Sequence, residues 1–442
     1  MIKPFKEVYQ CDSITLNLTN NCNLDCVYCF EHSKSKDYMT PETGITIIDN
    51  AYRELDGDSE FMVNFFGGEP FLNWNTMKAI IDHCNEKKYK ILYGVTTNLT
   101  ILTDEMIRYI DNNNNIHLLV SADGLPFIHN RNRCNSWTKV ANNINRLIQE
   151  GLGIFIEIRM TIMPKDVDMA ILGVRRFVEM GLDNICPCPV TDVEWDKHNI
   201  EDLHNFYYDL LRYYCTLLND DTSNRNFCIK NTDEILVNVM EPEVHTPYMC
   251  PIGKNTWCAF DTNGDIYPCH QLPTQKDKLS QKIGNIYTGV DDSKITDGKN
   301  IAKYPKPECK TCIGMSVCAS GCPEENLRQT GDMNIPSDGY CAVQKELVSA
   351  VKEFQDKIIN ASNVRNRLLN RLKENLKIKE YIDTVLATTN PADRLNLSIR
   401  LMHLQEMINA LGEENIFPSF GDYFENKIIE YGAKAIATQK DN

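Results

Sequence analysis

Three closely spaced cysteines constrain this chain more than any other feature of its sequence. Cys22, Cys26 and Cys29 follow a Cx3Cx2C spacing directly after the apolar segment 14–19, which has the pattern of a β-strand. Three thiolates on one loop can bind three irons of a 4Fe–4S cluster and leave the fourth iron open to a small molecule. Structural zinc sites and electron-carrying clusters normally use four ligands. The count of three therefore favours a reactive iron–sulfur site over the alternative of unrelated or zinc-binding cysteines.

Strand and helix patterns alternate through the first half of the chain. Capping residues open two of the helical patterns, at Thr40-Pro41 and at Thr103-Asp104. Repeated βα units with right-handed crossovers predict a parallel sheet. The expected strands are 14–19, 61–66, 90–97, 117–122, 153–161 and 184–190. The cysteine loop follows the first of them.

Polar and flexible residues follow the next three expected strands. Gly67-Gly68-Glu69-Pro70 follows the second strand, where glycines permit close backbone approach and Glu69 supplies an anion; a run like this in isolation would be an ordinary turn. Thr97 and Asn98 end the third strand. Ser121 and Asp123 end the fourth strand. These groups are expected to gather at one edge of the sheet.

Two arginines near these strands are harder to assign from sequence. Arg133 could hold a carboxylate through charge-assisted hydrogen bonds, or it could be a solvated loop residue. Arg159, in the middle of the fifth expected strand, could pair with Glu157 or point toward a ligand. Cys186 and Cys188 end the sixth strand; they could handle a substrate, but small apolar fillers are the favoured interpretation.

A second group of cysteines lies between residues 241 and 344, where Pro and Gly are frequent and helical patterns fade. A small domain of this composition needs metal ligation in place of a large core. Its cysteines are Cys250, Cys258, Cys269, Cys309, Cys312, Cys318, Cys322 and Cys341. The four from 309 to 322 follow a Cx2Cx5Cx3C spacing, and a zinc ribbon is the alternative interpretation.

The cysteine loop, the Gly67–Pro70 run and the second cysteine group together resemble the radical SAM superfamily, in the peptide-modifying branch with a C-terminal SPASM domain. Asn23, Tyr28 and Phe30 beside the first cysteines also fit this branch. The resemblance implies an α/β fold, a partial (β/α)6 TIM barrel, followed by a small cysteine-rich Fe–S domain and a helical extension. The expected domains are residues 1–235, 236–345 and 346–442.

The resemblance also implies three 4Fe–4S clusters and S-adenosylmethionine (SAM) as cofactors. Cys22, Cys26 and Cys29 would hold the SAM-binding cluster. One auxiliary cluster would use Cys250, Cys258, Cys269 and Cys322, and the other Cys309, Cys312, Cys318 and Cys341, so that both would be fully ligated. The residues expected to contact SAM are Gly67, Gly68, Glu69, Pro70, Thr97, Asn98, Ser121, Asp123 and Arg133. Asn130 stands where many relatives have Asp.

The implied activity is cleavage of SAM to a 5′-deoxyadenosyl radical, which abstracts hydrogen from a ribosomally made precursor peptide. Tyr267-Pro268-Cys269-His270 is more like enzymes that join a cysteine sulfur to carbon than like sulfatase-maturing enzymes, which have Asp in place of His270. His270 is a candidate catalytic base, with tuning of a cluster as the alternative. Formylglycine formation on a sulfatase is the second expected function. A non-catalytic Fe–S electron carrier is the third.

Partners follow from the same resemblance. A flavodoxin or ferredoxin-like protein would supply electrons. Because about a dozen residues precede the first expected strand, no N-terminal winged-helix module is expected to bind a leader peptide. A separate leader-binding protein, or the expected helices over 362–386, 394–410 and 423–438, would take that role; the alternative for these helices is packing or dimerisation.

Net charge and cysteine content restrict the partners and the cellular compartment that can be expected. The net charge of −15 argues against a nucleic acid as the main partner, and no apolar run approaches the length of a membrane span. Eighteen cysteines without a secretory signal indicate metal ligation in a reducing compartment. A cytoplasmic protein is therefore expected.

Overall fold

The structure is a computed structural model of the chain. It describes residues 2–31, 34–55, 60–218, 227–232, 235, 250, 252, 256–274, 281–294, 306–315 and 317–359. The chain divides into two compact units, Met1–Ala361 and Ser362–Asn442, and every described residue belongs to the first. The helices expected over 362–438 lie outside the described residues.

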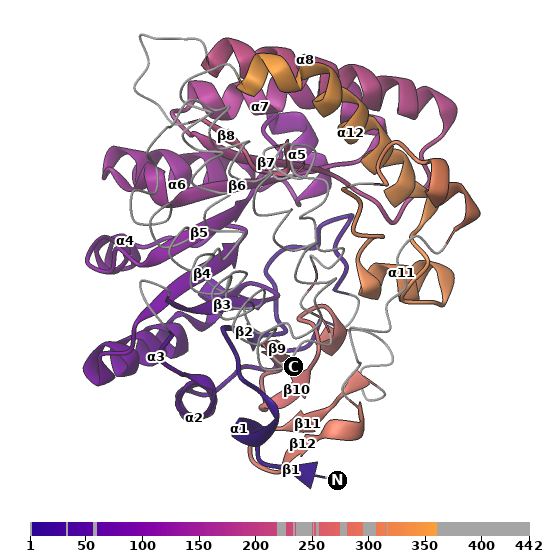
Figure 1. Cartoon of the computed structure of the whole chain (residues 1–442). Helices are drawn as coiled ribbons and strands as arrows, with labels where there is room; N and C mark the ends of the chain where they lie inside the picture. The colour runs from indigo at the N-terminus through magenta and orange to yellow at the C-terminus, as the bar shows by residue number, and fades with distance from the viewer. Residues whose placement is uncertain are drawn as a thin grey trace, which may run out of the picture. The chain divides into compact units, whose positions relative to one another are not determined.

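Six parallel strands form the centre of the first unit, in the order of the sequence (Figure 1). They are β2 (Ser13–Thr19), β3 (Phe61–Gly67), β4 (Ile91–Thr97), β5 (Ile116–Ser121), β6 (Ile156–Ile162) and β7 (Asn184–Pro189). The six expected strands are confirmed to within three residues at each end. The fifth begins three residues late, because residues 152–155 form the 3-10 helix η2 (Leu152–Phe155).

Helices follow the strands as the βα pattern predicts. Thr40 and Thr103 cap two of them, each accepting a hydrogen bond at 3.2 Å, from the backbone N–H groups of Thr43 and Met106. The helices are α2 (Pro41–Ala51), α3 (Trp74–Lys87), α4 (Asp104–Asp111), α5 (Pro126–Asn132), α6 (Trp137–Gln149), α7 (Ala170–Glu179) and α8 (Lys197–Leu218). α3, α4 and α6 lie on one side of the strands (Figure 1). This arrangement is a partial (β/α)6 barrel.

Side chains alternate between the two faces of these strands. Leu16, Phe65 and Val95 are completely buried on the face that packs against the helices. In β3 to β6 the opposite, inner face carries the more accessible side chains, among them Phe66 and Arg159. The inner face is therefore the polar, accessible side of the barrel.

The cysteine-rich segment continues the same sheet beyond β2. β9 (Trp257–Phe260) pairs in parallel with β2, and further short strands follow it in antiparallel pairs. These are β10 (Asp265–Tyr267), β11 (Gly284–Asn285), β12 (Gly289–Asp291) and β1 (Ile2–Lys3), which precedes the short helix α1 (Phe5–Val8); β8 (Cys228–Ile229) pairs with β7 at the other edge. The barrel and the cysteine-rich segment thus share one twelve-stranded sheet.

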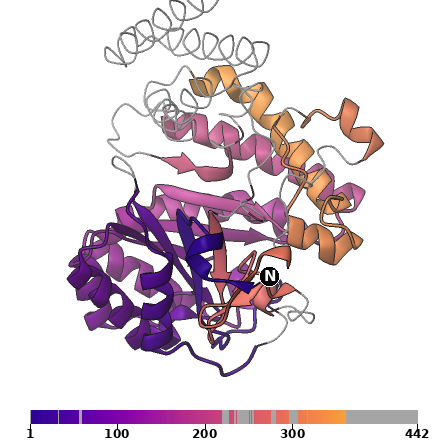
Figure 2. The same ribbon diagram turned by 60° about the horizontal axis from the view of Figure 1, so that its bottom comes forward.

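Two helices complete the described part. α11 (Pro323–Thr330) follows the second cysteine group, and α12 (Asp338–Ile359) lies along α8 in both ribbon views (Figures 1 and 2). His204 of α8 and Glu346 of α12 are 2.9 Å apart. The expected domain boundary at residue 345 falls inside α12.

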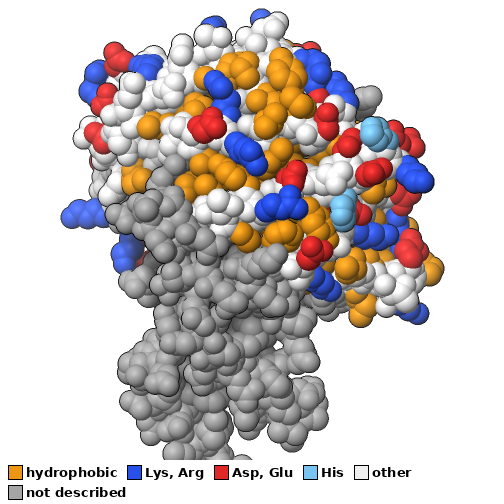
Figure 3. Space-filling view, turned by 90° about the horizontal axis from the view of Figure 1, so that it is seen from above, with side chains coloured by type: hydrophobic (Ala, Val, Ile, Leu, Met, Phe, Trp, Pro, Cys, Tyr) orange, Lys and Arg blue, Asp and Glu red, His pale blue; other side chains and the backbone are white. Residues whose placement is uncertain are grey.

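One face of the unit, seen in Figure 3, mixes hydrophobic patches with acidic and basic side chains. Within the described ranges, no helix combines the length and the apolar character that a membrane span requires.

Candidate functional site

The cysteine loop leaves the carboxyl end of β2 and lies against the end of β3. The backbone N–H of Gly68 donates to the Thr19 carbonyl at 2.8 Å, and that of Glu69 donates to the Asn21 carbonyl at 2.9 Å. A Cβ atom added to Gly67 or Gly68 would overlap these same two carbonyl groups, and Gly67 has a φ of 123°. The two glycines are therefore required for the close contact between the two motifs.

The three cysteines of the loop are half-buried. Burial raises the pKa of all three thiols, that of Cys22 to about 11. The Asn98 side-chain amide and the Leu24 backbone N–H approach Cys22 Sγ at 3.8 and 3.5 Å. Iron binding would supply the positive charge that these buried thiolates need.

No three Cys, His, Asp or Glu side chains in the described ranges converge as ligands of a single metal ion. Each thiolate of a 4Fe–4S cluster binds a different iron, so the ligands of such a cluster need not converge on one point. The spacing and chemistry of the loop thiols fit a cluster better than a single zinc ion.

Glu69 is buried and joins the ends of β3 and β4. Its carboxylate accepts hydrogen bonds from the Thr97 hydroxyl at 2.8 Å, the Asn98 backbone N–H at 2.7 Å and the Phe71 backbone N–H at 3.0 Å. Burial raises its pKa to about 7, although the three hydrogen bonds oppose the shift. Pro70 follows as the first residue of the 3-10 helix η1 (Pro70–Asn73). The structure thus brings Gly67–Pro70, Thr97 and Asn98 together.

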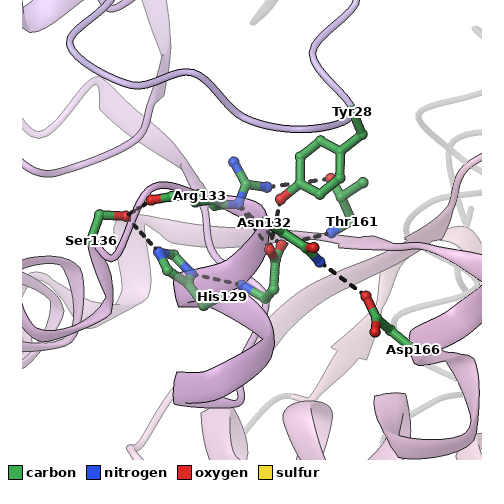
Figure 4. Close-up of polar contacts among 8 residues, drawn as sticks. Tyr28, His129, Asn132, Arg133, Ser136, Thr161 and Asp166 are labelled. Carbon is green, nitrogen blue, oxygen red and sulfur yellow. Dashed lines mark hydrogen bonds and ion pairs between the residues drawn. The ribbon is translucent and has the colours of Figure 1, made fainter.

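Asp123 and Arg133 form a buried ion pair beneath the cysteine loop (Figure 4). Arg133 Nε lies 3.1 Å from both carboxylate oxygens of Asp123, and its guanidinium lies 4.9 Å from the ring centre of Tyr28. The Tyr28 hydroxyl donates to Asp123 at 2.6 Å. Arg133 is therefore a buried residue that holds Asp123, and the alternative of a solvated loop arginine is wrong.

Further polar contacts extend this network in ways that the sequence did not reveal. Thr161 of β6 donates its backbone N–H to Asp123 at 3.3 Å, and its hydroxyl lies 3.3 Å from Arg133 Nη2. His129 contacts Ser136 at 2.9 Å, and burial lowers its pKa to about 3. Ser121, the remaining expected SAM contact, is half-buried on β5 beside Arg159 of β6. Thr161 carries no motif signal, and only strand register could have indicated it.

Of the cysteines expected to hold the first auxiliary cluster, the structure brings three together. Cys250 packs against the buried group that contains Cys269, and nearby Cys322 and Cys250 add to the effect of burial in raising the pKa of Cys269. Cys258 lies elsewhere: it is completely buried within β9, and its thiol contacts Cys11. Among the contacts of the described residues, Cys258 is thus grouped with Cys11, and Cys269 with Cys250 and Cys322.

The four cysteines expected to hold the second auxiliary cluster lie near one another. The pKa of the Cys318 thiol is raised mainly by burial and further by nearby Cys312 and Cys309. The pKa of the Cys341 thiol is also raised mainly by burial, and nearby Cys318 and Cys309 add to the shift. The Tyr340 hydroxyl also lies 3.9 Å from Cys318 Sγ. These four thiols are thus electrostatic neighbours at the start of α12.

His270 lies close to the cysteine loop and to the strand that precedes Gly67. Its ring packs edge-on against Phe66 at 4.7 Å, Trp257 at 6.0 Å and Phe30 at 6.3 Å between ring centres. Burial, followed by nearby Arg159, lowers its pKa to about 4. The imidazole is therefore neutral near pH 7 and lies among aromatic rings from three separate segments.

Comparison with known sequences supports this site. Residues 16–178 match the family model of the radical SAM superfamily. The radical SAM cyclopropyl synthase TigE of Paramaledivibacter caminithermalis is 34% identical over 130 residues, which are 26% of this chain and 27% of that protein. The cysteine-type anaerobic sulfatase-maturating enzyme of Clostridium novyi is 24% identical over 349 residues, 72% of this chain and 88% of that enzyme. The chain thus spans about a quarter of the first relative and most of the second.

Solved structures share the fold. Histidine-tagged anSMEcpe with bound AdoMet has a TM-score of 0.64 and 22% identity, covering 82% of this chain and 98% of that one. Streptococcus suis SuiB bound to precursor peptide SuiA has a TM-score of 0.54 and 17% identity, covering 76% and 77%. Together with the cysteine loop and the strand-end residues gathered around it, the family match identifies residues 16–178 as a radical SAM domain.

Proposed function

We propose that this chain is an enzyme that uses SAM and a 4Fe–4S cluster on Cys22, Cys26 and Cys29 to modify a peptide or protein, most specifically by forming a cysteine thioether. The cluster, when bound, would supply the electron that cleaves SAM to a 5′-deoxyadenosyl radical. The observation that carries the proposal is the cysteine loop fixed between Gly68 and the Tyr28–Asp123–Arg133 network.

The residues around the loop would then have separate tasks. Glu69 and Asn98 would shape the end of the sheet where SAM lies, because their hydrogen bonds fix the backbone after β3 and β4. Asp123 and Arg133 neutralise each other, so their expected direct contacts with SAM would use only the atoms that their own pairing leaves free. Their main contribution would be to fix the position of the loop.

Two similarities support a peptide or protein substrate. The curated relative that this chain covers most fully, among the two described above, is a sulfatase-maturating enzyme. SuiB, which shares the fold, has been solved with a precursor peptide. A reductant of the flavodoxin or ferredoxin type and a separate leader-binding protein belong to the same proposal.

The thioether product is proposed because of the position of Cys258. If Cys250, Cys269 and Cys322 are the protein ligands of one auxiliary cluster, then one iron has no cysteine from the described residues beside it. A substrate thiolate is a suitable fourth ligand for such an iron. Eight ligating cysteines would argue against direct thiolate binding, whereas the burial of Cys258 beside Cys11 supports a set of seven.

Sulfatase maturation is the second candidate. The similarity to the Clostridium novyi enzyme over 72% of the chain favours it. His270 would act as the base in this case, since it neighbours the cluster ligand Cys269 and faces Phe66 beside the proposed SAM site. In thioether formation, His270 would either act as a base or tune the auxiliary cluster.

Iron content tests the ligand assignment. Fully reconstituted protein should contain about twelve irons, because it would hold three four-iron clusters. Cys258→Ser should keep this content and the spectrum of the reduced clusters, whereas Cys269→Ser should lose up to about four irons. An equal loss of iron from both variants would contradict the three-cysteine set.

Product analysis tests the function separately. Reconstituted protein would be incubated with SAM, dithionite and either a cysteine-containing precursor peptide or the cysteine peptide of a sulfatase. A thioether product loses two hydrogens and its cysteine no longer reacts with iodoacetamide, whereas a formylglycine product reacts with a hydrazide. Formation of 5′-deoxyadenosine with hydrazide-reactive product would replace the thioether proposal by the second candidate.

A further inference from the structure

Cys186 and Cys188 form a second thiol group on the inner face of the barrel, outside the three expected cluster sites. They occupy alternate positions of β7, where strand register places Cys186 beside Arg159 and Cys188 beside Thr161 of β6. Their sulfur atoms are 3.4 Å apart, within sulfur hydrogen-bond distance. Arg159 donates from Nη1 to Cys186 Sγ, also at 3.4 Å. From the sequence, small apolar packing residues are the favoured interpretation of these two cysteines. In the structure, charged side chains of Arg159, Glu157 and Lys230 lie near them instead.

The charges around the pair favour one thiolate. The pKa of Cys186 is lowered from 9.0 to about 7, first because Cys188 donates a hydrogen bond to it and then because Arg159 is close, against the effect of burial. Glu157 of β6 opposes this shift, and Lys230 after β8 favours it. Tyr207 of α8 also faces the pair, and its own pKa is raised by burial. The Cys188 thiol and Arg159 thus favour a thiolate on Cys186 near neutral pH.

Cys84 is a buried thiol in this protein whose pKa is set mainly by burial. It is completely buried, and its pKa is raised to about 11 chiefly by burial. Its side chain lies on α3, where the groups that act on its pKa are Tyr93 and Asp49 rather than a cation. The pKa values of Cys84 and Cys186 therefore differ because Cys186 has Cys188 and the cation Arg159 beside it, and not because it is less deeply buried.

We propose that Cys186 and Cys188, with Arg159, form a nucleophilic thiol site inside the barrel that reacts with disulfides carrying a carboxylate group. Arg159 is exposed on the inner face and uses one N–H in its contact with Cys186. A guanidinium has five N–H donors in a planar fork, so the remaining donors can bind a carboxylate beside the reacting sulfur. Reactive cysteines are typically found in electropositive surroundings. Cys186 itself is buried, while half-buried Cys188 and exposed Arg159 lie beside it on the inner face.

The reaction is thiol–disulfide exchange. The thiolate attacks one sulfur of the incoming disulfide; that S–S bond breaks, a mixed disulfide forms and the other sulfur leaves as a thiolate. If the second cysteine then loses its proton and attacks, it expels the second thiolate, so the incoming disulfide is reduced by two electrons and the pair is oxidised. Residues two apart on a strand have Cα atoms roughly 6.4–6.8 Å apart, at the upper limit for a disulfide. The mixed disulfide should therefore be the species that accumulates.

Labelling of the reconstituted full chain tests the proposal. Oxidised glutathione, which carries carboxylates, and the neutral 4,4′-dithiodipyridine would be added anaerobically across pH 6–9. Peptide mapping by mass spectrometry without reduction would then follow the peptide that contains both cysteines. Cys84 serves as an internal reference for a buried thiol, and Arg175→Gln, which removes an arginine that packs on Tyr213, is the control for loss of charge.

Modification in the wild type should be half-maximal near pH 7, with Cys84 unmodified. Arg159→Gln should move the midpoint upward and abolish the preference for glutathione, and Cys188→Ala should also raise the midpoint by removing the main donor. If the pKa of Cys186 returned fully from about 7 to 9.0, the fraction of Cys186 present as thiolate at pH 7 would fall about fiftyfold. The nucleophilicity of that thiolate would rise about eightfold at the same time, because a more basic thiolate attacks faster. The rate of disulfide exchange would therefore fall by at most about sixfold.

Labelling of the pair no faster than of Cys84, with both disulfides, would overturn the proposal. Equal pH profiles and equal glutathione preference in wild type and Arg159→Gln would also overturn it, because Arg159 would then have no part in the reaction. Neither result depends on SAM cleavage or on the peptide product.

Discussion

Glu69 illustrates how single buried side chains define this site. Three protein donors surround its carboxylate, yet burial still dominates and raises the pKa to about 7. At pH values between the ordinary pKa of 4.5 and the folded-state pKa of about 7, Glu69 binds more protons in the folded protein than in the unfolded chain. The contribution of Glu69 to stability is therefore greatest at low pH and is lost as the pH rises through 7.

The first prediction follows from that sign. Glu69→Gln should gain stability relative to the wild type between pH 5 and pH 8, by up to about 3 kcal/mol, because the buried charge never forms. Urea unfolding midpoints of the two proteins across this range measure the difference. Glu105→Gln, at an exposed surface pair, is the control. A constant difference between wild type and Glu69→Gln would show that Glu69 does not titrate in this range.

The Asp123–Arg133 pair gives the second prediction. Removing one partner from a buried ion pair typically costs about 3–5 kcal/mol, because the other charge is left uncompensated. Asp123→Asn and Arg133→Gln should each be strongly destabilising, and the double variant should cost clearly less than their sum. Denaturant unfolding of the four proteins gives the coupling. Strictly additive losses would mean that the two groups do not stabilise each other as the structure shows.

At the scale of elements, the contact between the cysteine loop and β3 depends on two glycines. A side chain at Gly68 would overlap the Asn21 carbonyl, so either the loop or the strand end would have to move. Because that carbonyl accepts a hydrogen bond from the Glu69 backbone N–H and directly precedes Cys22, the displacement would reach the first of the proposed cluster ligands.

The third prediction uses this contact. Gly68→Ala should lose up to about four irons and most SAM cleavage, because the loop that carries the proposed ligands of the first cluster would be displaced. Gly153→Ala is the matched control, because a Cβ there would make an ordinary contact with Ile148. Iron analysis and 5′-deoxyadenosine formation measure both effects. Full iron content in Gly68→Ala would mean that the close contact is not needed for the cluster.

Elements were more predictable from the sequence than contacts between them. The strands from β2 to β7 follow from apolar alternation and turn residues, and the caps at Thr40 and Thr103 follow from local chemistry. The pairing of Arg133 with Asp123 and the separation of Cys258 depend on tertiary packing, which spacing along the chain does not encode. Cys258 shows this most clearly, because only the pairing of β9 with β2 places it beside Cys11.

For the whole described unit, the continuous sheet has a mechanical consequence. β9 pairs directly with β2, the strand that leads into the cysteine loop, so the cysteine-rich segment is joined to the barrel by strand pairing and not by a linker alone. Cys269 follows β10 in the same sheet, and His270 beside it reaches Phe66. The proposed auxiliary cluster and the proposed SAM site are thus connected through one sheet.

The central claim is that this chain performs radical SAM chemistry at Cys22, Cys26 and Cys29. The most direct measurement is formation of 5′-deoxyadenosine after SAM and dithionite are added to anaerobically reconstituted protein. Wild type should form it, and the variant with all three cysteines replaced by Ala should form none while it keeps about eight irons in its auxiliary sites. A wild-type protein with its full iron content that forms no 5′-deoxyadenosine, or an active triple variant, would contradict the account.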